Sequence, residues 1–272
     1  MTKITESVEI PVARPLEPQG RAIVIGASSG LGAALTQELA RRGYVVAALA
    51  RRFDELAVLC EQINDTAVSH KKNGAPHGRA IPVAHDATDY EAIPALFHDL
   101  VQEMGGLDLI IYNAGVMPPV GPDEYDFAKD YQMVSVNLLG AMAWLNLAAV
   151  RFQQAGKGRI VGISSVAGDR GRRNNPGYQT SKGGLSVYLE SLRNRLSQYG
   201  VNVTTIKPGF IDTQMLDNAP KTFWVISPEE AAKRLVTAVE KNRQTVYLPA
   251  RWGLVMLIIR HIPSFIFRRL SI

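Results

Sequence analysis

The sequence has little cysteine, no secretory leader and no long apolar run, and each shortage excludes a class of protein. Its single cysteine, Cys60, cannot form an internal disulfide, which fits a reducing compartment and predicts a cytoplasmic protein. The first residues carry Glu6 and Glu9 and lack the apolar core of a signal peptide. We find no stretch with the roughly 20 apolar residues that span a bilayer. The histidines are dispersed, so no metal site is predicted.

Charge is also modest and spread along the chain. The 272 residues contain 30 Lys plus Arg against 25 Asp plus Glu, a formal net charge of +5, without a long basic run. A balance of this kind does not predict a nucleic-acid partner. With 46% hydrophobic residues, the chain can bury the core of one large domain. We expect an extended, proline-containing arm over 1–19, a catalytic domain over 20–248, and an apolar and basic tail over 249–272.

Short apolar runs alternate with amphipathic segments from residue 21 to residue 248. The runs predict strands, the weakest of which contains Pro82, and the segments between them predict helices. Strands separated by helices indicate an α/β fold with about seven parallel strands, doubly wound, with helices on both faces. The predicted strands cover 22–25, 45–49, 80–83, 107–111, 160–163, 201–206 and 245–248; the predicted helices cover 31–42, 53–66, 89–104, 126–154, 178–199 and 228–241.

A glycine-rich turn follows the first predicted strand and opens the first predicted helix. Glycine permits a tight turn and close approach of a pyrophosphate, and the helix N-terminus then offers free N–H groups to the phosphates. The spacing G-x-x-x-G-x-G differs from the usual dinucleotide fingerprint, and a plain strand–helix turn is the alternative. Its position after the first strand favours a dinucleotide site built from Gly26, Ser28, Ser29, Gly30, Leu31 and Gly32.

The second predicted strand ends at Ala50, followed by Arg51 and Arg52. A carboxylate at this point binds the free ribose hydroxyls of NAD, whereas arginine suits the 2′-phosphate of NADP. We therefore favour NADP(H), the alternative being that both arginines are merely solvated. Asp86 and Ala87 follow the third strand, where Asp86 can bond the adenine amino group, cap a helix, or do both.

Tyr178 and Lys182 lie four residues apart in a predicted helix, so their side chains share a face. A neighbouring ammonium lowers the pKa of a phenol and prepares it for proton transfer. Ser165 stands 13 residues ahead of Tyr178, after a buried strand, where its hydroxyl can bond the same substrate oxygen. Taken alone, a Tyr-x-x-x-Lys pair is far more typical of an exposed helix surface than of a catalytic site.

With these residues the chain resembles the short-chain dehydrogenase/reductase family, a Rossmann-type fold, over roughly 20–248. Further matches are Asn113-Ala114-Gly115, Asn137, and Pro208-Gly209 with Ile211 and Thr213. The resemblance implies that Tyr178 is the general acid or base, and that Lys182 lowers its pKa and binds the nicotinamide ribose.

The resemblance assigns the remaining roles in the same way. Ser165 would bond the substrate carbonyl, and Asn137 would hold a relay water. The segments Asn113–Gly115 and Pro208–Thr213 would line the cofactor. Two positions depart from the family pattern, since Ile25 stands where threonine is common and Tyr112 where a first asparagine is common.

Three further segments bear on substrate and partners. Arg170, Arg172 and Arg173 either recognise an anionic substrate or form a solvated loop, which we favour. The apolar segment 214–226 resembles the family's lid and favours a lipophilic carbonyl or alcohol substrate. The tail over 251–270 is basic and apolar; it either packs on the protein or an oligomer partner, our first choice, or contacts a membrane surface peripherally. By resemblance, the two long helices form a homodimer or homotetramer interface.

Three functions remain open at this stage. The leading hypothesis is an NADP-dependent carbonyl reductase or alcohol dehydrogenase. The alternatives are a non-catalytic NADP-binding regulatory or scaffold protein and a membrane-associated, lipid-modifying reductase. The presence of Asn137, Ser165, Tyr178 and Lys182 together argues against a non-catalytic protein.

Overall fold

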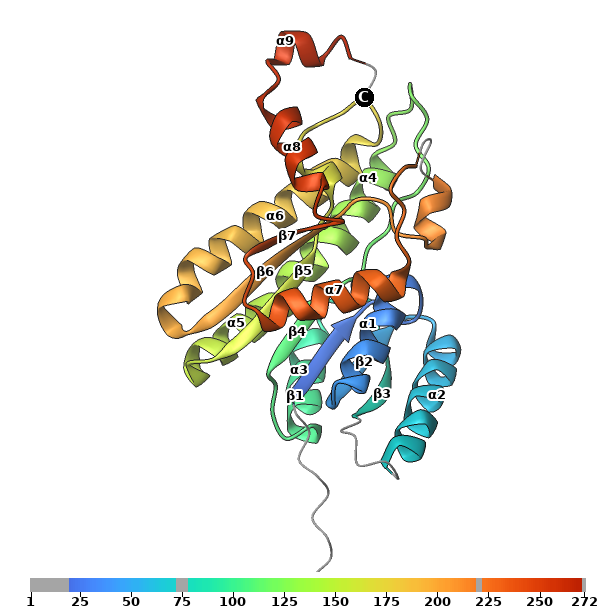
Figure 1. Ribbon diagram of the computed structural model, residues 1–272, viewed down its shortest axis with the longest axis vertical. Coiled ribbons are helices and arrows are strands. Elements are labelled where there is room, and N and C mark those ends of the chain that lie inside the picture. Colours follow the sequence, from blue (N-terminus) through green and yellow to red (C-terminus); the bar gives the residue numbers. More distant parts are fainter. Residues whose placement is uncertain (1–19, 72–77, 219–221, 271–272) are drawn as a thin grey trace, which may run out of the picture.

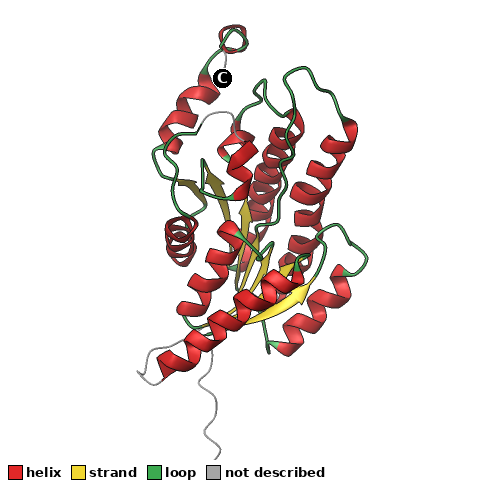
Figure 2. Cartoon of the chain, turned by 90° about the vertical axis from the view of Figure 1, so that its right-hand side faces the viewer, coloured by secondary structure: helices red, strands yellow, loops and turns green. Residues whose placement is uncertain are grey.

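The computed structural model describes residues 20–71, 78–218 and 222–270. Within them, one sheet of seven parallel strands has the order β3-β2-β1-β4-β5-β6-β7, as the doubly wound prediction requires (Figures 1 and 2). The predicted arm over 1–19 lies outside the described residues. The strands are β1 (Gly20–Ile25), β2 (Tyr44–Ala50), β3 (Arg79–Ala84), β4 (Leu109–Tyr112), β5 (Gly158–Ile163), β6 (Val201–Pro208) and β7 (Thr245–Leu248).

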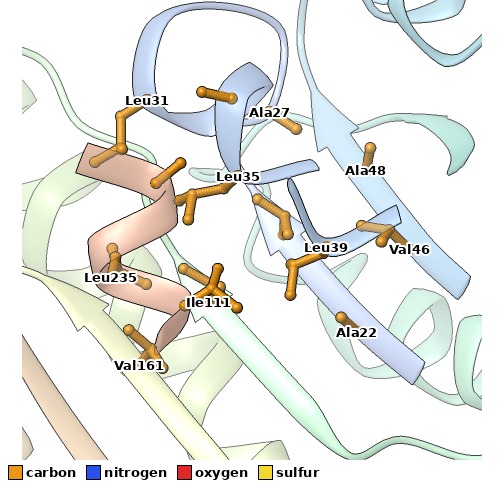
Figure 3. Close-up of a cluster of buried hydrophobic side chains, with 14 of the residues drawn as sticks. Ala22, Ala27, Leu31, Leu35, Leu39, Val46, Ala48, Ile111, Val161 and Leu235 are labelled. Carbon is orange, nitrogen blue, oxygen red and sulfur yellow. The ribbon is translucent and has the colours of Figure 1, made fainter. Parts of the chain in front are cut away.

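Helices cover both faces of this sheet, because each strand is apolar on both sides. In β1, Ala22 and Val24 join one core cluster, and Ile23 and Ile25 join the other. The first cluster receives side chains from α1 and α7 (Figure 3) and from α2, and the second receives them from α3, α5 and α6. The helices are α1 (Gly30–Arg41), α2 (Phe53–Lys71), α3 (Ile93–Glu103), α4 (Phe127–Val134), α5 (Gly140–Ala155), α6 (Pro176–Leu196), α7 (Pro228–Glu240), α8 (Trp252–His261) and α9 (Ser264–Phe267).

The strand order places a crevice where the candidate residues lie. From β1 the chain first builds β2 and β3 on one side, then returns to add β4 to β7 on the other. At such a reversal the loops after the two central strands diverge and leave room for a ligand at their carboxyl ends. The glycine loop follows β1, the Asn113 turn follows β4, and Ser165 follows β5. The topology alone therefore gathers segments that are far apart in the sequence.

Several predicted boundaries were wrong for identifiable reasons. Helix α2 continues to Lys71, five residues past its predicted end at 66. Helix α3 begins at Ile93 rather than at 89, because Asp86 and Asp89 accept hydrogen bonds from Thr88 and Ala92 and hold this segment in turns. Strand β4 begins at 109 rather than 107. Pro82 is tolerated because β3 is an edge strand.

The helix predicted over 126–154 is interrupted by a π-helical segment, η1 (Ser135–Leu139), between α4 and α5. The segment carries Asn137, and π-bulges are frequent at functional sites. Buried Tyr112 supports it by donating from its hydroxyl to the Val136 carbonyl at 2.5 Å. A Cβ at Gly140 would collide with the Tyr112 hydroxyl. The family departure at position 112 is thus accommodated by Gly140, the residue that directly follows η1.

The combined helix 127–155 also corrects the expectation that no segment is long and apolar enough to cross a bilayer. Its best window has a mean hydropathy of 1.6 and passes that test by length and composition. Half of the window is buried in the protein, however, and α5 packs Trp144 and Phe152 into the second core cluster. The segment is therefore built into the fold as a core helix.

The Tyr112 contact predicts a measurable stability effect. Tyr112→Phe should lower the free energy of unfolding by about 1–3 kcal/mol, because it removes the donor to a buried carbonyl. Tyr90→Phe is a matched control, since Tyr90 donates to the Ser135 carbonyl of the same segment but is partly exposed, so water can replace it. Urea unfolding would compare the two variants. Equal losses in the free energy of unfolding would show that burial does not strengthen the contribution of the Tyr112 bond to stability.

Candidate active site

The glycine loop lies directly against the turn that follows β4. Gly26 and Gly30 have left-handed φ angles of 84° and 52°, a region that favours glycine. A Cβ on Gly26 would lie 2.6 Å from the Ala114 backbone, and one on Gly30 would lie 2.8 Å from the Thr213 side chain. Three predicted segments, after β1, β4 and β6, therefore meet within van der Waals distance.

Asn113 locks this contact. Its Nδ2 donates to the Gly26 carbonyl at 2.7 Å, and its backbone N–H donates to the Ile25 carbonyl at 2.9 Å. A Cβ on Gly32 would collide with that same Gly26 carbonyl. Ile25 itself is buried in the core, so the departure from threonine leaves the backbone link to Asn113 in place. Leu31 is buried in the first core cluster.

The two arginines after β2 lie beside the glycine loop. Arg52 donates from Nη2 to the hydroxyls of Ser28 at 3.1 Å and Ser29 at 2.6 Å. Arg51 is exposed and its Nη1 lies 3.7 Å from a carboxylate oxygen of Asp86. The end of β2 is therefore cationic and adjoins the N-terminus of α1.

Asp86 takes part in a turn and does not cap α3. Its Oδ1 accepts the backbone N–H of Thr88 at 2.9 Å and the Thr88 hydroxyl at 2.8 Å. Burial opposes ionisation of this carboxyl, but the Thr88 bonds and the nearby Arg51 charge lower its pKa overall. Ala87 is buried in the second core cluster. The Asp86 side chain therefore stabilises its own turn and not a helix, and its bond to the adenine amino group stays a prediction.

Ser165, Tyr178 and Lys182 converge after β5. Ser165 precedes the short helix η2 (Val166–Asp169) and its Oγ accepts the Ala167 N–H at 3.1 Å. Asn175 caps the N-terminus of α6, accepting the Tyr178 N–H at 3.0 Å and donating to the Pro118 carbonyl at 3.1 Å. All three predicted side chains are buried.

Contrary to the prediction, the pKa of Tyr178 is not lowered beside Lys182. Burial raises the pKa of Tyr178 to about 12, opposed by the hydrogen bond with Ser165. Burial likewise lowers the pKa of Lys182 to about 8. The Lys182 ammonium donates to the Ile163 carbonyl at 2.8 Å and lies 5.8 Å from the centre of the Tyr178 ring. Desolvation of the phenol therefore outweighs the neighbouring cation.

Asn137 and Gly115 complete the same cluster. The Asn137 Oδ1 accepts the Val116 N–H at 2.7 Å, and its Nδ2 donates to the Val116 carbonyl and the Ser181 hydroxyl, each at 3.0 Å. A Cβ on Gly115 would lie 3.3 Å from the Lys182 ammonium and 3.4 Å from Asn137 Oδ1. The turn after β4, the π segment and α6 are thereby held together. The amide of Asn137 binds backbone on one side and faces Lys182 across Gly115 on the other.

The segment after β6 meets both the glycine loop and the tail. Gly209 follows Pro208, and a Cβ there would collide with the Trp252 indole of α8. Ile211 forms an isolated bridge with Ile226, which closes the segment that carries the predicted lid. Within that segment Met215 lies with its sulfur 3.9 Å from the Tyr178 hydroxyl. Part of the lid, 219–221, lies outside the described residues.

The charged loop that follows Ser165 contacts other elements of the same chain. Buried Asp169 pairs with Lys207 of β6 and accepts the Tyr247 hydroxyl of β7 at 2.7 Å. Arg170 donates to the carbonyls of Ile259 at 2.6 Å and Ile262 at 2.5 Å at the end of α8.

The other two arginines of this loop also contact the tail. Arg173 donates to the Arg268 carbonyl at 3.1 Å, and Arg172 contacts the Met256 sulfur at 3.5 Å. All three arginines contact the C-terminal helices, so the loop is not merely solvated, and recognition of an anionic substrate stays a prediction.

Sequence reasoning missed several residues of this region. Asn175 directly before Pro176 is a recognisable helix start, so its cap could have been predicted. Ser181, Lys207, Tyr247 and Trp252 give no local signal, because their partners are distant in sequence.

A cavity of about 790 Å³ between α7 and β7 contains none of the predicted site residues.

Comparison with known proteins agrees with this geometry. A family model described as short chain dehydrogenase matches residues 21–223. An uncharacterised oxidoreductase of Mycobacterium tuberculosis is 32% identical over 232 residues, covering 84% of this chain and 87% of that protein. A ketoacyl reductase of Nostoc is 30% identical over 230 residues, covering 82% of this chain and 76% of that protein.

A solved structure is similar over nearly the same length. A 3-oxoacyl-[acyl-carrier protein] reductase from Brucella melitensis, with bound NAD, aligns with a TM-score of 0.71 at 26% identity, covering 86% of this chain and 91% of that chain. The family model, the relatives and the seven-stranded sheet all indicate the same family. The chain belongs to the short-chain dehydrogenase family and is an oxidoreductase of that family.

Proposed function

We propose that the protein is an NADP(H)-dependent oxidoreductase that interconverts a lipophilic ketone or aldehyde and the corresponding alcohol. One observation carries the proposal: a glycine loop suited to a dinucleotide and a buried Ser165–Tyr178–Lys182 cluster meet at the same edge of the sheet, joined through the Asn113–Gly115 turn. In this proposal 20–248 form the catalytic domain, 249–272 form a tail, and the protein is cytoplasmic.

The residues around the glycine loop fit a dinucleotide with a 2′-phosphate. Helix α1 begins after Ser29 without a side-chain cap and without an acidic residue in its first turn, so its N–H groups suit a pyrophosphate. Arg51 and Arg52 suit the extra phosphate of NADP, and β2 ends at Ala50 without a carboxylate. Asn113–Gly115 and Pro208–Thr213 would line the nicotinamide end. When bound, this cofactor supplies or accepts the hydride.

The buried side chains have matching tasks in carbonyl reduction. Negative charge develops on the substrate oxygen, and Tyr178 and Ser165 offer it two hydroxyl donors. A Tyr178 pKa of about 12 keeps the phenol protonated near neutral pH, as a proton donor requires. Lys182 supplies a cation next to Gly115, and Asn137 holds the Val116 turn beside it. Asn137 would also position the relay water that the resemblance implies.

Aromatic side chains around Trp252 and the Met215 sulfur at Tyr178 support a lipophilic substrate. Phe210, Phe223 and Trp224 surround Trp252, with ring centres 5.9, 5.1 and 5.5 Å from it. Met215 contacts the Tyr178 hydroxyl itself. The 30% identical Nostoc relative is named a ketoacyl reductase, which is compatible with an extended apolar substrate.

The same proposal includes self-association. Val150 of α5 and Val187 of α6 are exposed apolar side chains on the two long helices that the family resemblance assigns to the subunit interface. We propose a homodimer or homotetramer built on these helices. Paired helices would bury surface that is otherwise unfavourable in water.

Tyr178→Phe tests the chemistry. It removes the proton donor but keeps the ring, so ketone reduction should fall by at least about 10³-fold while NADPH still binds. NADPH consumption with a panel of ketones, and NADPH fluorescence for binding, would measure the two effects. Tyr188→Phe on the same helix is the control and should retain activity. Unchanged turnover in Tyr178→Phe would refute the mechanism, whereas a wild-type protein that binds NADPH but reduces none of the ketones would favour the scaffold alternative.

Arg51→Ala tests the cofactor preference. Loss of a charge-assisted bond of about 1.5–3 kcal/mol should raise the KM for NADPH roughly 10- to 100-fold and leave the KM for NADH nearly unchanged. Arg41→Ala, an exposed arginine at the far end of α1, is the matched control. Steady-state kinetics with both cofactors would decide. Equal increases in the KM values for NADPH and NADH would show that Arg51 does not recognise the 2′-phosphate.

A further inference from the structure

The two C-terminal helices each have a buried side and an exposed apolar side. Trp252 and Met256 of α8 and Phe267 of α9 are buried against the protein. Leu254 and Ile258 of α8 are 66% and 60% exposed. The prediction that the tail packs on the protein therefore accounts for one side only. The exposed side, here called the tail surface, consists of Leu254, Leu257, Ile258, Phe265 and Ile266.

The tail surface continues into the lid. Phe223, Trp224 and Val225 are exposed as well, and the rings of Phe223 and Trp224 pack on Trp252 of α8. Figures 1 and 2 show α8 and α9 projecting from one end of the molecule, at the carboxyl edge of the sheet. Large apolar side chains from two segments are thus concentrated in one exposed area, which soluble surfaces seldom show without a binding role.

Positive charge surrounds these apolar side chains. From Arg251 to Ile272 the sequence has four arginines and His261, and no aspartate or glutamate. In α8, Arg251, Leu254, Ile258 and His261 follow one another at intervals of three and four residues, so they lie along one face. Arg260, Arg268 and Arg269 are exposed near the other end of the surface.

The tail surface is held firmly to the catalytic domain. The guanidinium of Arg170 binds carbonyls at the C-terminus of α8 and lies 4.0 Å above the Phe267 ring of α9. Arg173 binds the Arg268 carbonyl. The helices are therefore presented in one fixed orientation, with Arg170 and Arg173 adding two more cations at their base.

We propose that the tail surface docks the protein on an anionic lipid bilayer. Exposed apolar side chains can enter the boundary between headgroups and acyl chains, while the arginines bind the anionic headgroups. The ten residues of α8 are too few to span the bilayer, so the contact is peripheral. A second copy fits poorly, because a two-fold contact would bring the same arginines against each other without acidic partners. The docking does not depend on the redox function proposed above.

Vesicle flotation of the full chain tests the docking. The wild-type protein should float with phosphatidylcholine vesicles that contain phosphatidylglycerol, should not float with phosphatidylcholine alone, and should be released by high salt. The double variants Leu257→Asp with Ile258→Asp, and Arg268→Glu with Arg269→Glu, should each reduce binding roughly tenfold or more. All four positions are exposed, so the variants should fold, and thermal melting would verify this.

Matched controls carry the same changes elsewhere on the surface. Val58→Asp on α2, at a side chain 54% exposed, and Lys241→Glu with Arg243→Glu after α7 should float like the wild type. Absence of wild-type flotation, or equal flotation of all variants, would overturn the proposal. The proposal would also be overturned if light scattering showed a wild-type dimer that does not bind vesicles and that dissociates when Leu257 and Ile258 are replaced. Turnover of a water-soluble ketone would be measured in the docking variants as well. Because membrane binding and turnover are measured separately, failure of the docking proposal can be distinguished from failure of the proposed redox function.

Discussion

The contact between the glycine loop and the turn after β4 is the constraint on which the site depends. Gly26 lies so close to Ala114 that no side chain fits between them, and Asn113 ties the two loops by donating from Nδ2 to the Gly26 carbonyl. Gly115, the last residue of that turn, then lies beside Lys182 and Asn137. A loop suited to phosphates and a cluster suited to proton transfer are thereby fixed to each other by the backbone, and neither can shift independently.

Burial sets the electrostatics of the cluster more than any charge pair does. Tyr178 and Lys182 both lose water when the chain folds, so the phenol retains its proton and the ammonium releases its proton more readily. The polar groups are nonetheless paired, Lys182 with the Ile163 carbonyl and Asn137 with Val116 and Ser181. Such satisfied networks are rigid, which suits a site that must hold a donor and an acceptor at fixed distances.

The sequence predicted the sheet well because its signals are local. Thr245–Leu248 and the other apolar runs lie between glycine, proline and polar residues that mark their ends, and the site motifs follow strand ends directly. The π segment around Asn137 could not be predicted, because one extra residue in a turn barely alters the apolar periodicity. The contacts of Arg170 with α8 join residues about 90 positions apart, so no local pattern reveals them. The Tyr178 pKa depends on burial, which spacing alone does not report.

Tyr112 and Gly140 also bear on how this sequence could change over time. The phenol occupies the space where any Cβ at position 140 would stand, so glycine there is a precondition for tyrosine at 112. A lineage that acquires the tyrosine first must pass through an overpacked intermediate. Replacement of Gly140 alone is therefore blocked while Tyr112 is in place. The Ala87 carbonyl would also lie 2.7 Å from a Cβ at position 140, so the backbone itself favours glycine there.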